Sequence, residues 1–232
     1  QRMQQWLAAP KLRALALFLG CDLVEHLKDQ AQPILPVFVP AVFAALADQD
    51  PDVRTPAAYA ISLAAPLQGF AEAAPEAFRS LATLASLPAP KKRDQRARVA
   101  LDNVVAALLV LVRARPALCP QDVPAWDIIV GKLPLRDDEE EAKKVHAAVV
   151  DLLVEQHAGL FGPDATHLGK ILSALAEVYH QEDLCTKETD AKIQHVFKCV
   201  PQEKLASFAG SFTEKQQRKI TKMVLTTAER GG

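Results

Sequence analysis

The sequence is poor in the residues on which sheet-rich folds depend. Its 232 residues include only nine glycines, two tyrosines, two tryptophans and a single asparagine, Asn103. Tight hairpin turns need glycine or asparagine, and strands favour aromatic side chains. This scarcity argues against a β-sandwich or a Rossmann fold. A composition that is 50% hydrophobic and 24% charged also excludes intrinsic disorder.

An excess of charge of one sign is missing too. The formal net charge is −1, and like charges form no long block. We therefore expect no direct nucleic-acid partner and no membrane partner. The four cysteines (Cys21, Cys119, Cys185 and Cys199) are far apart in the chain. They are too few for a disulfide framework, which favours a reducing compartment.

Long apolar runs are also absent. Residues 104–112 fall well short of the ~20 residues that cross a bilayer, and the apolar run 34–46 is interrupted by Pro36 and Pro40. The amino terminus shows no basic-then-apolar signal and begins at Gln1. These features predict a section of a longer chain.

The chain is rich in alanine, leucine and proline. Alanine and leucine favour helices, and sixteen prolines in such a sequence indicate many short helices that end sharply. The stretch 44–65 reads AALADQDPDVRTPAAYAISLAA. Here one helix ends near Asp48, Asp50 can cap the next, and Pro51 can take its first position. A helix, a tight acidic turn with D-x-D-P-x-V-R and a second helix form the signature of a HEAT repeat.

The acidic turn recurs along the chain. It is found at Asp50, Asp94, Asp137 and roughly Asp183, at spacings inside the ~40–47 residues of HEAT arrays. We therefore predict an all-α fold, an α-α superhelix (solenoid) of about five HEAT repeats forming one array over residues 1–232. The expected units are a half repeat at 11–28 and helix pairs at 33–68, 74–115, 121–158, 163–200 and 202–229. The half repeat should expose apolar side chains at Trp6, Leu7, Leu12 and Leu15.

Several segments resemble one family. They are DLVEH (22–26), DVRTPAAYAI (52–61), DNVVAA (102–107), WDIIVGKLPLRDDEEEA (126–142), DLLVEQH (151–157), FGPDATHLGKILSALAE (161–177) and TEKQQ (213–217). In this order they resemble the carboxy-terminal region of karyopherin-β (importin-β superfamily) nuclear import receptors, specifically the importin beta-3 subgroup. Segments 68–98 and 184–210 depart from that pattern.

The resemblance implies a transport receptor that shuttles between cytoplasm and nucleus. Such receptors bind protein cargo with basic targeting segments on the concave face and phenylalanine-glycine nucleoporins on the outer face. They release cargo when Ran-GTP binds, mainly through an amino-terminal part that this chain lacks. The alternative is a structural HEAT scaffold of a multiprotein complex, like a phosphatase scaffold subunit.

Polar residues on the second helix of each pair are the candidate cargo contacts. They are Asp22, Glu25, Asp102, Asn103, Asp151 and Glu155. Carboxylates along a groove suit a basic, extended peptide. The alternative is that these residues are solvated or tie neighbouring helices together. Phe38 and Phe43 are candidates for a nucleoporin slot, or are plain core.

Two charged runs admit a structural interpretation. The acidic run 137–141 suits the start of a helix, where it complements the helix dipole. The basic run 91–93 is either a solvated loop or a targeting or anion contact.

A search for chemistry finds no catalytic or cofactor pattern. The sequence has no GxGxxG, no GxxxxGK[ST] and no paired CxxC. His180, Cys185, His195 and Cys199 form the one metal-like group, and their spacing does not fit zinc. We therefore expect a protein that is not an enzyme and that has no cofactor, no metal and no catalytic residues.

Overall fold

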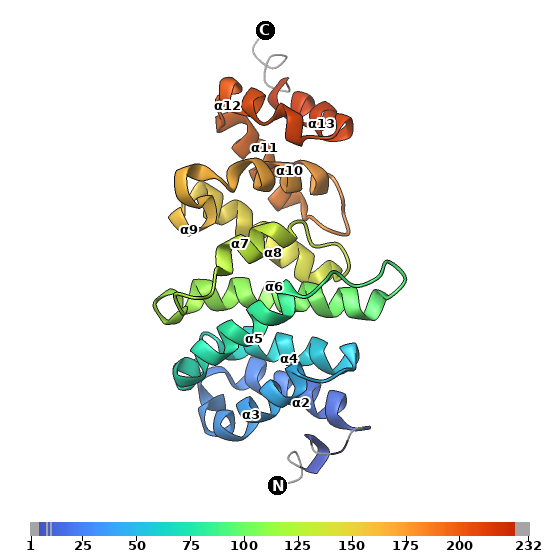
Figure 1. Cartoon of the computed structure of the whole chain (residues 1–232), viewed down its shortest axis with the longest axis vertical. Coiled ribbons are helices and arrows are strands. Elements are labelled where there is room, and N and C mark those ends of the chain that lie inside the picture. The colour runs from blue at the N-terminus through green and yellow to red at the C-terminus, as the bar shows by residue number, and fades with distance from the viewer. Residues whose placement is uncertain (1–4, 8, 10, 226–232) are drawn as a thin grey trace. The chain divides into compact units, whose positions relative to one another are not determined.

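The computed structural model describes residues 5–7, 9 and 11–225, and within these ranges it contains helices and no strand (Figure 1). The last expected helix pair spans 202–229, and its final residues, 226–229, lie outside the described residues. The α-helices are α2 (Arg13–Leu27), α3 (Leu35–Leu46), α4 (Pro51–Ala64), α5 (Ala74–Ser86), α6 (Gln95–Ala114), α7 (Ala125–Lys132), α8 (Glu139–Val154), α9 (Ala158–Phe161), α10 (Leu168–Val178), α11 (Lys187–Cys199), α12 (Gln202–Ser207) and α13 (Glu214–Leu225). Short 3₁₀ turns are η1 (Lys28–Ile34), η2 (Gln68–Ala73), η3 (Pro116–Leu118), η4 (Pro163–Ala165) and η5 (Ala209–Ser211).

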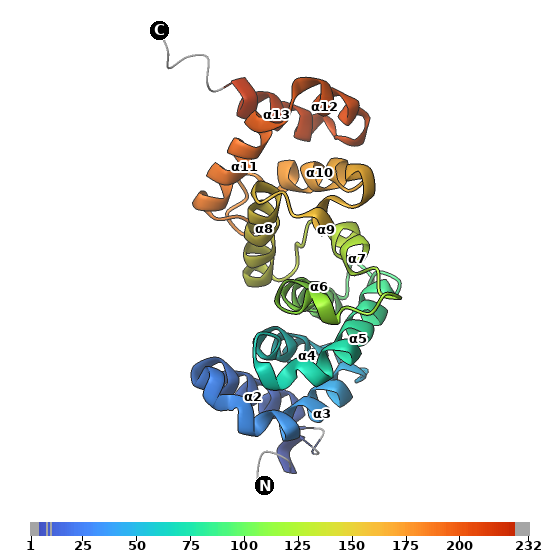
Figure 2. The same ribbon diagram turned by 90° about the vertical axis from the view of Figure 1, so that its left-hand side faces the viewer.

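The chain divides into two compact units, Gln1–Ile128 and Ile129–Gly232, and the division falls within α7. In the first unit, α4 packs between α2 and α6, while α3 packs on α4 and α5 on α6. The unit therefore has two layers of helices, which are seen side on in Figure 2. The same organisation in the second unit places α11 between α8 and α13, with α10 against α11 and α13.

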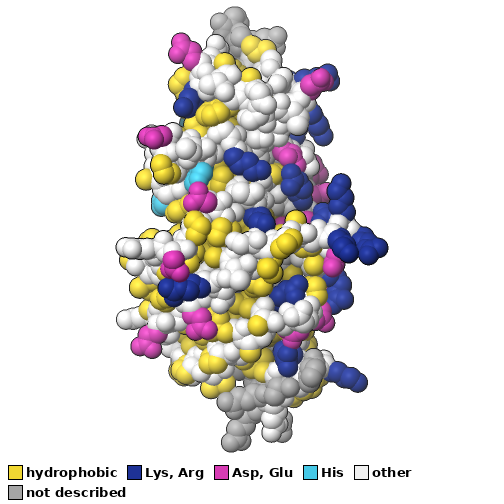
Figure 3. All heavy atoms as spheres, viewed as in Figure 1, with side chains coloured by type: hydrophobic (Ala, Val, Ile, Leu, Met, Phe, Trp, Pro, Cys, Tyr) yellow, Lys and Arg dark blue, Asp and Glu magenta, His cyan; other side chains and the backbone are white. Residues whose placement is uncertain are grey.

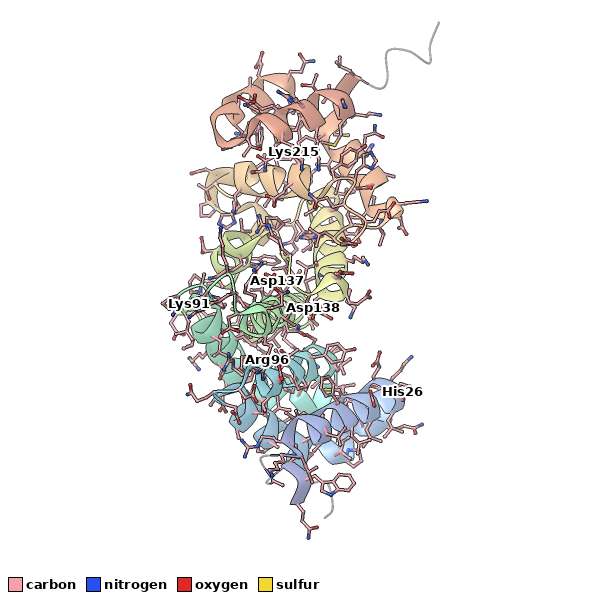
Figure 4. The ribbon with its side chains drawn as sticks, turned by 90° about the vertical axis from the view of Figure 1, so that its right-hand side faces the viewer. His26, Lys91, Arg96, Asp137, Asp138 and Lys215 are labelled. Atoms are coloured by element: carbon pink, nitrogen blue, oxygen red, sulfur yellow. The ribbon has the colours of Figure 1, made fainter. Side chains whose placement is uncertain are left out.

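Side-chain caps begin the second helix of each pair. Asp50 accepts a hydrogen bond from the Asp52 backbone N–H (3.0 Å), and Asp94 accepts one from the Ala97 N–H (3.1 Å). At the next two turns the caps are Asp138 and Thr186, which lie within three residues of the turns expected at Asp137 and roughly Asp183. Figure 4 shows Asp137 and Asp138 side by side before α8.

Small residues let the helices of the first unit approach closely. A Cβ added to Gly20 of α2 would lie 2.2 Å from Cε2 of Phe38, whose ring is fully buried between the helices. Ala57, Ala60 and Ala64 of α4 are buried as well. The alanine-rich composition of this half therefore reflects close helix packing.

Charged side chains tie successive repeats of the first unit together. Arg96 at the start of α6 bridges Asp50 and Asp52 at the start of α4. At the other end of α6, Arg115 donates hydrogen bonds to the carbonyls of Ala65 (3.0 Å), Pro66 (3.0 Å) and Leu67 (2.8 Å). These carbonyls follow the last turn of α4 and have no partner within that helix.

Equivalent ties occur in the second unit. Gln216 of α13 donates to the Ser173 carbonyl of α10 (2.9 Å), and its Oε1 accepts from the Thr213 N–H (2.7 Å). Lys219 donates to the carbonyls of Glu177 (2.8 Å) and Tyr179 (2.6 Å) at the end of α10. Residues 213–216 thus form a capping box that also fixes α13 on its neighbour.

The expected apolar surface on the first repeat is present in part. Trp6, Leu12 and Leu15 are 39%, 41% and 67% exposed, and Phe18 and Leu19 of α2 are exposed beside them. Leu7 is the exception, because it is buried. Its neighbour in space is Arg13, whose Nε donates to the Leu7 carbonyl (3.1 Å).

One stretch of the described residues, Arg13–Leu46, is long and apolar enough to be a candidate membrane span by length and composition alone. In the structure it is not a continuous helix. The 3₁₀ turn Lys28–Ile34 separates α2 from α3, which have 15 and 12 residues. Each is shorter than the ~20 residues of a spanning helix.

A buried histidine holds the connection between α10 and α11. His146 of α8 is 1% exposed, and its Nδ1 lies 2.8 Å from the Leu184 carbonyl oxygen. Because a carbonyl only accepts, Nδ1 carries the hydrogen, and Nε2 is buried with no partner among the described residues. Burial lowers the pKa of His146 below its ordinary value.

We expect stability to fall as the pH falls below about 6.5, because the unfolded histidine then takes a proton that the folded one resists. His146→Asn should remove this loss, since its amide can replace the Nδ1 donor without titrating. The measurement is urea unfolding at pH 7.5 and pH 5.5 for both proteins. An equal loss of stability between pH 7.5 and pH 5.5 in the two proteins would show that His146 is not responsible for the pH dependence.

Candidate protein-binding surface

The structure buries three of the residues predicted from the sequence to contact ligands. Asp102 and Asn103 of α6 are 6% and 4% exposed, and the Asn103 Nδ2 donates to the Val99 carbonyl of its own helix (3.1 Å). Phe38 is fully buried against Gly20. These three predictions are corrected, because neighbouring helices cover the side chains. Phe43 is half-buried on α3.

The other four predicted residues lie at the carboxyl ends of two helices. Asp22 and Glu25 are exposed in the last two turns of α2, which ends beside His26 (Figure 4). Asp151 lies in the last turn of α8, and Glu155 is its exposed C-cap residue. The first pair belongs to one compact unit and the second pair to the other, so they form two separate acidic sites.

Acidic side chains outnumber basic ones at the end of α2, where Asp22 and Glu25 precede the C-cap residue Lys28. Burial, together with the charges of Asp22 and Glu25, raises the pKa of the Cys21 thiol to about 12. The partial negative charge at the carboxyl end of the helix adds to that of the carboxylates. Asp22 and Glu25 also repel each other at a spacing of three residues. A bound cation would relieve both costs.

Tyr59 completes the α2 site. Its hydroxyl lies on the adjacent helix α4, 3.4 Å from Oε2 of Glu25. This distance permits a hydrogen bond that would hold the carboxylate toward the boundary between the two helices. The sequence pattern did not single out Tyr59, because its role depends on how α4 packs on α2.

The α8 site already holds a cation. Nζ of Lys192 on α11 lies 3.0 Å from Oδ1 of Asp151 and 3.1 Å from Oε1 of Glu188. The hydrogen bonds to Asp151 and Glu188 raise the pKa of Lys192. A basic ligand would have to displace Lys192 from Asp151. The α2 site is therefore the better candidate for a basic partner.

The remaining charged and metal-like features lie elsewhere in the structure. The run 137–141 contains the cap of α8 and the acidic residues of its first turn. The basic run 91–93 is exposed in the loop before α6, where Lys and Arg side chains gather (Figure 3). The Cys199 Sγ lies 3.5 Å from the His195 Nε2, and no cluster of three metal-binding side chains occurs in the described part of the chain.

The protein is an all-α solenoid of HEAT type, as the sequence predicted. Two solved structures of Kap121p share this fold. The one bound to RanGTP has a TM-score of 0.72 and 16% identity, and covers 95% of this chain and 20% of that chain. The one bound to Nup53p has a TM-score of 0.71 and 17% identity, with the same coverage. The chain thus spans about a fifth of the length of Kap121p. No protein-family model matches it.

Proposed function

We propose that this chain is the carboxy-terminal HEAT region of a karyopherin-β nuclear import receptor of the importin beta-3 subgroup. It binds protein cargo and carries out no catalysis. The family-like segments 126–142 and 161–177 and the shared fold with Kap121p over 95% of the chain support this proposal. In this proposal the whole receptor shuttles between cytoplasm and nucleus.

The observation that carries the proposal is the acidic carboxyl end of α2. Asp22 and Glu25 are exposed there, and the helix dipole and their mutual repulsion favour a bound cation. A lysine or arginine of a basic targeting segment supplies that cation through charge-assisted hydrogen bonds. Tyr59 limits the positions open to the Glu25 carboxylate, which reduces the entropy lost on binding.

Other partners belong to the same proposal. Solved structures of Kap121p include complexes with RanGTP, Nup53p and Ste12p. By analogy we propose that Ran-GTP releases cargo from the whole receptor, and that phenylalanine-glycine nucleoporins bind its outer face. Phe43 is the remaining candidate for that second contact.

The test of the α2 site is charge reversal. A fluorescein-labelled heptapeptide with five lysines should bind the 232-residue chain about tenfold more weakly after Asp22→Lys with Glu25→Lys. The matched control is Glu72→Lys with Glu76→Lys, which changes the charge equally at two exposed sites of the same unit. Equal weakening in both variants would mean that only net charge matters, and would remove the α2 site.

The receptor itself is tested by a pull-down with the intact cellular protein, with and without Ran-GTP. Loss of bound proteins on addition of Ran-GTP is the expected result. Bound proteins that stay in place would favour the structural scaffold instead.

A further inference from the structure

Helix α13 carries a stripe of positive charge. Lys215, Arg218, Lys219 and Lys222 lie at spacings of three and four residues, so they share one face of the helix. Within Glu214–Leu225 the only acidic residue is Glu214, whose Oε2 is 3.6 Å from an Arg218 nitrogen. Lys215, Arg218 and Lys222 are exposed. Figure 4 labels Lys215 on this helix, at the side that faces α10.

For an isolated helix, this row of like charges is unfavourable. Like charges three or four residues apart destabilise a helix, and the stripe contains four such pairs. Lys219 is further restricted, because its Nζ donates to two carbonyls at the end of α10. Burial, together with the nearby charge of Lys215, lowers the pKa of the Lys219 ammonium. Glu214 offsets part of this repulsion at Arg218, and the charges of Glu177 and Asp190 favour the Lys219 ammonium. A concentration of cations on one helix face still suits an anionic partner.

The surface beside the stripe is hollow on two sides. A hollow of about 520 Å³ is lined by all four cations together with Thr213 and Glu214. A second one, of about 270 Å³, lies where α13 meets α10 and includes Lys215 and Lys219. Both hollows belong to the second compact unit. Carboxylate side chains of a partner therefore have room to approach the cations at the larger hollow, whereas Glu177 already lines the smaller one.

The helix that presents the stripe is held firmly. The capping box of Thr213 and Gln216 fixes its first turn, and Gln216 also bonds Ser173 of α10. Ile220 and Met223 are buried on the opposite face. The cations are thus displayed on an ordered support, which lowers the entropic cost of binding.

We infer that the cationic face of α13 binds an acidic protein segment, with its carboxylates placed against Lys215, Arg218 and Lys222. The stripe is about 10 Å long, which matches two or three carboxylates of a short peptide. This site goes beyond the proposed function, because it would recognise a charge opposite to that of a basic targeting segment.

Nucleic acid and anionic lipid fit this surface less well. Residues 129–232 contain 14 Lys and Arg against 16 Asp and Glu, so the unit gives a polyanion no general attraction. Helix α13 contains no aromatic side chain on which a base could stack. A matched local contact with a short acidic segment does not need either feature.

The experiment measures binding of a fluorescein-labelled Gly-Ser-(Glu)6 peptide to the 232-residue chain by anisotropy. We expect binding that is lost at high salt and weakened about tenfold or more by Lys215→Glu with Arg218→Glu. The control is Lys170→Glu with Lys187→Glu, which reverses two exposed cations elsewhere in the same unit. No binding, or equal weakening in the control, would overturn the inference. So would tighter binding of a dT20 oligonucleotide or of phosphatidylserine vesicles.

A second measurement needs no ligand. If the stripe is a binding surface rather than a stabilising one, Lys215→Gln should raise the Tm slightly, because it relieves repulsion by Arg218 and Lys219. A lower Tm would show that the charge stabilises the fold, and would count against the inference.

Discussion

Gly20→Ala is expected to destabilise the first compact unit by about 2–3 kcal/mol, although it adds a single methyl group. The added Cβ would lie 2.2 Å from Cε2 and 2.5 Å from Cζ of Phe38. Phe38 is fully buried, so its ring has no free space into which to move. The change should separate α2 from α3 locally or force the ring out of its preferred rotamer.

Gly131→Ala is the matched control, because a Cβ there meets nothing within 4 Å. It should be neutral or stabilise α7 by about 0.5–1 kcal/mol through helix propensity. Chemical unfolding of both variants gives the comparison. In the Gly20→Ala protein, Phe38→Leu should restore part of the lost stability, because it removes the ring that the new methyl group meets. In the parent protein, which has no such clash, the same substitution should not increase stability. Additive effects of the two substitutions would show that the ring is not the cause.

Arg115→Ala is expected to lower the free energy of unfolding by about 3 kcal/mol. The substitution removes three hydrogen bonds to the carbonyls of Ala65, Pro66 and Leu67. Hydrogen bonds from a charged donor contribute about 1.5–3 kcal/mol each, and partial exposure lets water replace some of that contribution. Arg115→Lys should be only a partial remedy, because one ammonium cannot reproduce the guanidinium geometry.

Arg113→Ala provides the control for this prediction. Arg113 is an exposed arginine two residues earlier on α6. Its loss should change the free energy of unfolding by less than about 0.5 kcal/mol. Thermal and urea unfolding of the three variants measure the effect. Equal losses for Arg113→Ala and Arg115→Ala would attribute the effect to net charge rather than to the three carbonyls.

The fold class could be predicted because its sequence signals, the helix caps and the turns, each lie within a single repeat. Asp50 directly precedes Pro51, which suits the first helical position, and Asp94 directly precedes the next long helix, and both do cap. Before α8, however, Asp137 and Asp138 are chemically identical neighbours, and only the backbone path decides which of them bonds the Glu141 N–H. At α11 the cap is Thr186, three residues beyond the acidic residue Asp183 at the same turn.

Burial on α6 was not predictable from the sequence in the same way. Asp102 and Asn103 are polar, and polarity usually means exposure. They are buried because other helices cover α6 on more than one side, and the sequence of a single helix does not show its neighbours. On α2, Asp22 and Glu25 are exposed, and the hydroxyl that contacts Glu25 belongs to Tyr59 on another helix, which the sequence of α2 does not show.

The connection between α10 and α11 has a mechanical consequence. His146 of α8 holds the Leu184 carbonyl, Lys219 of α13 holds the Tyr179 carbonyl, and Asp190 of α11 accepts from the His180 backbone N–H. One short loop is therefore fastened to three different helices. A stretching force on this unit would load all three attachments at once, so the helices α8 to α13 should yield together, in one step rather than repeat by repeat.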